Sequence, residues 1–128
     1  MAFTDAQRIA AAQSYIDALS SHRADDVPFA ADCIRLENGI KTGRNGDHLR
    51  HSLNNGPQFK VIERTTEPQY TVEGDVIRAK FDVLTKPRLL GYRVCSHVNE
   101  TFRIPPEHPS GVPTIEHIRA TLVPFVRK

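Results

Sequence analysis

The chain has 128 residues, of which 39% are hydrophobic and 25% are charged, and its formal net charge is +2. This length suits one domain with its own core, and the ordinary composition argues against intrinsic disorder. The 17 basic residues are spread along the chain, whereas nucleic-acid binders gather them in runs or on one face. We therefore expect residues 1–128 to form a single domain with no nucleic-acid partner.

The cysteines and the first residues of the chain bear on the cellular compartment of the protein. Cys33 and Cys95 are the two cysteines and form no C-x-x-C pair, so the sequence predicts neither a zinc site nor a redox motif. The first residues lack the basic and apolar segments of a signal peptide, and no apolar run has the length of a membrane span. We expect a cytoplasmic protein with free thiols, without a membrane partner, a metal or a cofactor.

The first predicted element is a helix. Thr4-Asp5-Ala6-Gln7 has the pattern of a capping box, and apolar residues follow at helical spacing as far as Leu19. This predicts a helix over residues 5–20. Tyr15 falls on the flank of its apolar stripe.

A short strand and a second helix follow. The sequence predicts the strand over residues 33–38, closed by Gly39, then a loop over 41–46 and a brief helix over 47–53. Asn54-Asn55-Gly56-Pro57 ends that helix.

The second half of the chain has the patterns of strands. Residues 59–72 are extended with an interruption at Glu67-Pro68, where proline indicates a bend or an edge position. Further strands are predicted over 76–85, 92–104 and 114–126. Consecutive strands with short connections usually pair antiparallel, and a helix packed on one face of such a sheet makes an α+β fold.

The strand over residues 92–104 is the most informative element. Alternate residues point to opposite faces. One face is apolar apart from Ser96 and Glu100, and we expect it to be the buried one; it holds Tyr92, Val94, Ser96, Val98, Glu100, Phe102 and Ile104. A carboxyl group in apolar surroundings either pairs with a cation or becomes neutral through a raised pKa. Glu100 is therefore part of a functional pocket, or half of a structural ion pair with an arginine, or at a frayed strand end open to water.

Two other strands carry residues of interest. Cys33, Arg35 and Glu37 share one face of the first strand, although alternation alone does not say whether that face is inside. In the last strand Ile118 and Ala120 share the apolar face, and a small residue such as Ala120 would leave room for a cavity.

The element order and four short motifs resemble the nuclear transport factor 2-like superfamily, which includes ketosteroid isomerases and the SnoaL-like polyketide cyclases. The resemblance covers residues 5–125 and implies a strongly curved, antiparallel or mixed sheet wrapped around the N-terminal helix, a cone-shaped, cystatin-like roll. It also implies a homodimer through the outer sheet face. The motifs are residues 11–19 in the first helix, Phe29-Ala30-Ala31-Asp32 before the first strand, Gly43 before the second helix, and residues 100–104, which look like the family's D-x-F-R-F strand.

The resemblance also implies site residues. Ketosteroid isomerases use a tyrosine on the first helix as a hydrogen-bond donor, a carboxylate near the end of the first strand as the proton-shuttling base, and a protonated acid on a later strand as the second donor. Tyr15, Glu37 and Glu100 occupy these positions. A shift of one residue in register would put Asn38 in place of Glu37, and Arg35 has no counterpart in the isomerase pocket.

Two kinds of function follow for a pocket that holds a small organic ligand. The first is an isomerase or cyclase that performs acid–base chemistry next to a carbonyl group. The second is a non-catalytic module for ligand binding or dimerisation, which a closed salt bridge between Arg35 and Glu37 would favour. In both cases the expected ligand contacts are Arg35, Ser96, Val98, Phe102, Ile118 and Ala120.

Overall fold

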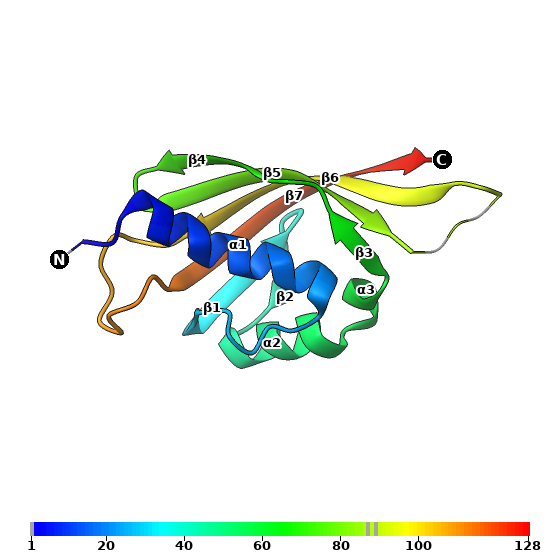
Figure 1. The fold of residues 1–128 in the computed structure, drawn as a ribbon. Helices are drawn as coiled ribbons and strands as arrows, with labels where there is room; N and C mark the ends of the chain where they lie inside the picture. The colour runs from blue at the N-terminus through cyan, green and yellow to red at the C-terminus, as the bar shows by residue number, and fades with distance from the viewer. Residues whose placement is uncertain (1, 87, 89) are drawn as a thin grey trace.

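A long N-terminal helix lies under a curved sheet (Figure 1). The computed structural model describes residues 2–86, 88 and 90–128, and these form three helices and seven strands. The helices are α1 (Asp5–Ser21), α2 (Gly46–Asn55) and α3 (Pro57–Lys60). The strands are β1 (Phe29–Glu37), β2 (Ile40–Gly43), β3 (Ile62–Thr65), β4 (Gln69–Glu73), β5 (Val76–Thr85), β6 (Arg93–Arg103) and β7 (Ile115–Arg127).

The seven strands form one mixed, open sheet. Its order is β2-β1-β7-β6-β5-β3, with β4 also paired to β5. The β1–β7 pair is parallel, and all other pairs are antiparallel. The sheet curves around α1 (Figure 1), which confirms the expected α+β architecture.

The sequence predicted α1 well. Thr4 caps the helix with a complete capping box, and the buried residues of α1 face the main hydrophobic core. Arg8 ties the helix to the sheet, because its Nε donates to the carbonyl oxygen of Ile104 and its Nη2 to that of Gly74, both at 2.6 Å. No helix in the described part of the chain is both long and apolar enough to cross a membrane.

Two segments differ from the sequence prediction. Residues 41–43, expected at the start of a loop, belong to β2, because Asn38 and Gly39 both have positive φ (50° and 82°) and turn the chain back on β1. Two successive residues with positive φ are typical of a tight hairpin turn. Phe59, expected in a strand, lies in the short helix α3, which begins at Pro57.

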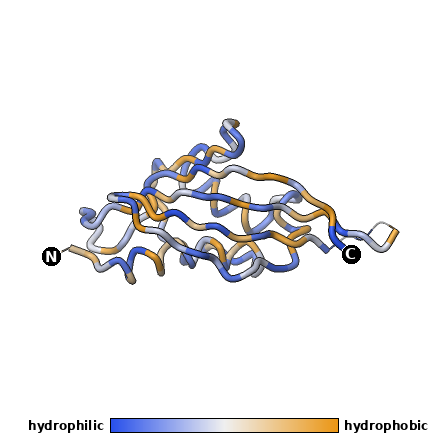
Figure 2. The backbone as a smooth tube through the Cα atoms, turned by 90° about the horizontal axis from the view of Figure 1, so that it is seen from above, coloured by the Kyte–Doolittle hydropathy of each residue, from blue (hydrophilic) through white to orange (hydrophobic). Residues whose placement is uncertain are grey.

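The predicted burial of one face of β6 is confirmed only where the helices cover the sheet. Val98, Glu100 and Phe102 are buried, as predicted, but Tyr92 and Val94 are 43% and 58% exposed. The first residues of β6 and the end of β7 extend beyond the helices (Figure 1). Hydrophobic and hydrophilic segments alternate along the long strands (Figure 2), so the pattern persists where no layer covers it.

Candidate functional site

A cavity of about 290 Å³ lies between α1, α3 and the inner face of the sheet. Its walls are largely apolar, with a few polar groups among them, as is usual for small-molecule pockets. Tyr15, Glu37 and Glu100 all line it. The remaining lining residues are Leu19, Gln58, Phe59, Ile62, Phe81, Val83, Thr85, Ser96, Val98, Ala120 and Leu122.

Strand pairing places both glutamates in one row. Ala120 on β7 pairs with Glu37 on one side and with Glu100 on the other. Neighbouring strands lie about 4.8 Å apart, so the two glutamate backbones are about 10 Å apart across β7. The small side chain of Ala120 between them leaves space above the sheet, where both carboxyl groups face the cavity.

Glu100 is a buried acid. Its exposed fraction is 3%, and its carboxyl group makes no hydrogen bond within the described residues. Burial raises the pKa of Glu100 to about 8, the negative charge of Glu37 adds to the rise, and Arg35 opposes it. At neutral pH the group is therefore mainly a protonated acid that can donate a hydrogen bond or a proton to a ligand.

Arg35 is completely buried and holds the site together. Arg35 lies on the inner face of β1. The alternation of the sequence did not decide whether this face of the strand is inside or outside. Its Nε donates to the Thr42 hydroxyl at 3.0 Å, and its Nη2 donates to the Thr42 carbonyl at 3.2 Å and to the Ser52 hydroxyl at 3.3 Å. The guanidinium carbon lies 4.7 Å from the centre of the Phe59 ring, so Phe59 covers this cation on the cavity side.

Tyr15 receives a hydrogen bond from this arginine. Arg35 Nη1 donates to the Tyr15 hydroxyl oxygen at 3.2 Å, and the Tyr15 ring packs edge-on against Phe29 and Phe102. Burial raises the pKa of Tyr15 far above its usual range, despite the opposing charge of Arg35. The phenol thus keeps its proton, and that O–H has no acceptor within the described residues.

Glu37 is the more accessible of the two acids. It is the last residue of β1, and its side chain is 21% exposed. Its Oε1 lies 3.7 Å from Arg35 Nε, a long ion-pair contact, because that N–H donates to Thr42 instead. The structure also resolves the choice of register, since Asn38 lies in the turn and its side chain bonds both the N–H and the carbonyl of Leu122.

The expected ligand contacts fall into two groups. Ser96, Val98 and Ala120 line the cavity. Arg35, Phe102 and Ile118 are fully buried beneath its wall and do not line it. β5 also contributes Phe81, Val83 and Thr85 to the cavity, which was not predicted. Alternation could have indicated it, because these three residues share one face of the strand.

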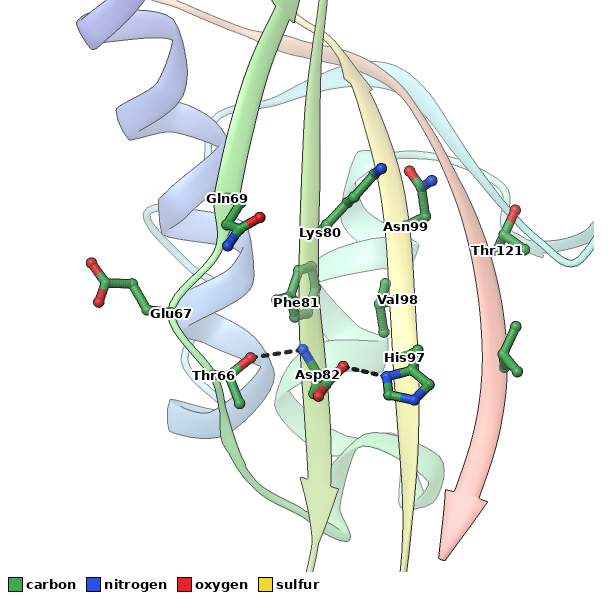
Figure 3. Close-up of a pocket in the computed structure, with 11 residues that line it drawn as sticks. Thr66, Glu67, Gln69, Lys80, Phe81, Asp82, His97, Val98, Asn99 and Thr121 are labelled. Carbon is green, nitrogen blue, oxygen red and sulfur yellow. Dashed lines mark hydrogen bonds and ion pairs between the residues drawn. The ribbon is translucent and has the colours of Figure 1, made fainter.

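A second hollow lies on the outer face of the sheet (Figure 3). Most of the residues that line it are polar, and its clearest feature is a contact of 2.7 Å between His97 Nδ1 and Asp82 Oδ1, with the His97 ring stacked on Phe125. Lys80 and Asn99 lie in the next row of side chains. No three His, Cys, Asp or Glu residues in the described part of the chain are grouped so as to hold a metal ion.

Solved structures with the same architecture are numerous but distant in sequence. SalBIII, an epoxide hydrolase/cyclase-like enzyme of pyran ring formation in the polyether salinomycin, has a TM-score of 0.70 at 14% identity, with 93% of this chain and 92% of that chain covered. A SnoaL-like family protein from Agrobacterium tumefaciens has a TM-score of 0.64 at 12% identity, with 92% and 98% covered. A ketosteroid isomerase-like protein from Erwinia carotovora atroseptica has a TM-score of 0.61 at 16% identity, with 92% and 95% covered.

These similarities establish the fold. The chain has the nuclear transport factor 2-like, SnoaL-like architecture that its sequence resembles. A comparison with curated proteins finds no match. The model of one protein family matches residues 2–122, nearly the whole chain, and the protein therefore belongs to that family, described as a domain of unknown function (DUF8021).

Proposed function

We propose that this protein is an acid–base enzyme, an isomerase or a cyclase, that acts on a small and mainly apolar organic molecule held in the inner cavity. The observation that carries the proposal is the presence of two carboxyl groups in one cavity with different surroundings. Glu100 is buried with a pKa raised to about 8, whereas Glu37 is partly exposed beside a guanidinium group. Two titratable groups in such contrasting environments are typical of an acid and a base that work together.

In an isomerase, the two groups would act on a carbonyl compound. Glu37 removes a proton from the carbon next to the carbonyl and returns it to another carbon. Tyr15 and protonated Glu100 donate hydrogen bonds to the enolate oxygen as its charge develops. Arg35 acts through Tyr15, because its hydrogen bond to the phenol oxygen polarises the O–H toward the ligand.

In a cyclase, the same pair would serve a ring closure. Glu100 protonates the oxygen that leaves when a strained ring or another electrophile opens, and Glu37 accepts the proton of the attacking hydroxyl group. SalBIII, an epoxide hydrolase/cyclase-like enzyme of pyran ring formation, has this fold. That likeness supports ring formation as one form of the proposed reaction.

The charge of the cavity constrains the substrate. Arg35 and Glu37 compensate each other, and Glu100 is mainly neutral below about pH 8. An ion placed beside Glu100 would lose its hydration without gaining a counter-ion. The buried end of the substrate is therefore an uncharged oxygen group such as a ketone, an enol or an ether.

The alternative is a ligand-binding module without turnover. The contact between Arg35 and Glu37 favours it, because a carboxylate in an ion pair is a weaker base. Against this alternative, the contact is 3.7 Å long and is not a hydrogen bond, since the Arg35 N–H groups are directed to Thr42, Tyr15 and Ser52.

The test combines two assays with matched variants. Exchange of α protons for deuterium in cyclic ketones, followed by NMR, measures enolisation, and conversion of hydroxy-epoxides to cyclic ethers measures ring closure. We expect one of these reactions to be accelerated, to fall at least about 100-fold in Glu37→Gln, and to decline as the pH rises through about 8 in the wild type. Glu67→Gln, an exposed acid outside the cavity, is the control.

Two results would contradict the proposal. Full activity in Glu37→Gln would show that Glu37 is not the catalytic base. Ligand binding without acceleration of either reaction would identify a binding module. Calorimetric titration of the same ketones into both variants separates loss of binding from loss of chemistry.

A further inference from the structure

The inner face of the sheet continues beyond the cavity as an exposed apolar surface. Val94 on β6 and Val126 on β7 are cross-strand partners and are 58% and 64% exposed. Tyr92 follows on the same face and is 43% exposed. We call these three residues, Tyr92, Val94 and Val126, the ledge.

The ledge and the cavity lie along the same continuous series of residue pairs between β6 and β7. The register between β6 and β7 runs without a bulge, so residues two apart stay on one face. Val94 on the ledge lies two residues before Ser96, which lines the cavity. From the cavity outward, the inner-face pairs are Glu100 with Ala120, Val98 with Leu122, Ser96 with Pro124, and Val94 with Val126.

The ledge is uncovered because the layer of helices ends before the strands do. Figure 1 shows the ends of β6 and β7 extending past α1 and α3. Thr85 at the end of β5 lines the cavity and donates to the carbonyl oxygen of Val94 at 2.6 Å. The cavity mouth and the ledge are therefore directly adjacent.

From these observations we propose that the substrate is elongated, with an uncharged oxygen group at Glu100 and an apolar chain that leaves the cavity and lies along the ledge. Glu100 and Val94 are six positions apart, which corresponds to about 20 Å along the strand at ~3.4 Å per residue. The Lys128 ammonium lies 5.5 Å from the centre of the Tyr92 ring, so the apolar surface ends there in a cation. The inference rests on the proposed function, because it takes the cavity as the substrate site.

A second copy of the chain is a weaker candidate for this surface. A stable protein interface buries about 800 Å² on each partner, far more than three side chains provide. A single alkyl chain fits a narrow strip that is two strands wide. Covering Val94 and Val126 removes apolar surface from water, which is the main source of affinity for such a chain.

The test measures affinity against chain length. Hexanone, tetradecanone and octadecanone, as straight-chain methyl ketones, are titrated calorimetrically into the wild type and into the double variant Val94→Thr/Val126→Thr. Threonine keeps the β-branched shape and exchanges one methyl group for a hydroxyl. Val123→Thr, on the outer face of the same β7 strand and 54% exposed, is the control.

We expect each methylene beyond the cavity mouth to raise the affinity of the wild type about twofold, which is half of the ~0.8 kcal/mol of a fully buried methylene. Octadecanone should then bind roughly 16-fold more tightly than tetradecanone in the wild type and in Val123→Thr, and less than about threefold more tightly in the double variant. Hexanone should bind equally to all three proteins.

Three outcomes would overturn the inference. The first is equal affinity for tetradecanone and octadecanone in the wild type. The second is the full chain-length effect in the double variant. The third is a wild-type dimer that the double variant dissociates in sedimentation experiments. These outcomes are independent of turnover. A chain-length effect without acceleration of any reaction would leave the ledge in place and contradict only the proposed function.

Discussion

Replacing Glu100 by glutamine should change the way the stability of this protein depends on pH. The pKa of Glu100 is raised from 4.5 to about 8, mainly by burial. Between these values the unfolded chain has released the Glu100 proton while the folded chain still holds it. The folded state therefore binds more protons, and the free energy of unfolding falls as the pH rises through this window.

The size of the effect follows from the shift. A difference of about 3.5 pKa units at about 1.36 kcal/mol each corresponds to a loss on the order of 4–5 kcal/mol, fully developed above about pH 8 and absent below about pH 4.5. Total stabilities of domains are about 5–15 kcal/mol, so this one group accounts for a large share. Glutamine has nearly the same shape and no charge at any pH, so Glu100→Gln should lack this contribution.

Urea denaturation followed by far-ultraviolet circular dichroism measures the difference. Between about pH 5 and pH 8 the wild type should lose about 3–4 kcal/mol more than Glu100→Gln, at an unchanged dependence on urea. Glu67→Gln should keep the wild-type slope, because Glu67 is exposed. If the free energy of unfolding depends on pH in the same way in the wild type and in Glu100→Gln, Glu100 ionises normally. The proposed site would then have no protonated acid at neutral pH.

Three further predictions concern the surroundings of the cavity. Tyr15→Phe leaves an N–H of buried Arg35 without its acceptor, so we expect a loss of about 1–3 kcal/mol in urea denaturation and of about 100-fold or more in turnover. Gly43→Ala would bring a Cβ to 2.3 Å from Leu49 Cδ2, which should cost about 1–3 kcal/mol by overpacking, and wild-type stability there would contradict the packing. Burial raises the pKa of Cys33 to about 12, so in mass spectrometry iodoacetamide should alkylate it about 1000-fold more slowly than glutathione, and a similar rate would show that the thiol is accessible.

Local sequence patterns predicted most elements but not all their boundaries. The capping box at Thr4 and the helix behind it are confirmed, because helix capping depends on residues within one turn. The β1–β2 hairpin was missed, although Asn38-Gly39 is the strongest short hairpin signal. The partner strand has only four residues, Ile40–Gly43, and so short a segment shows no clear alternation.

Burial was predicted less well at the ends of elements. Alternation correctly separated the two faces of β6 from Ser96 to Ile104. It assigned Val94 to the buried face as well, because periodicity reports which side a residue takes and not whether another layer covers that side. Cys95 shows the opposite case, since it is 1% exposed on the outer face.

The sequence by itself determined that Glu100 lies among apolar side chains of one strand face, because side-chain direction in a strand has a period of two residues. It also determined the N-terminal helix that carries Tyr15. Only the tertiary structure decided that Glu37 and Glu100 face one cavity on either side of Ala120. That arrangement depends on the parallel pairing of β1 with β7, two strands at opposite ends of the chain, whose register is set by long-range packing and not by neighbouring residues.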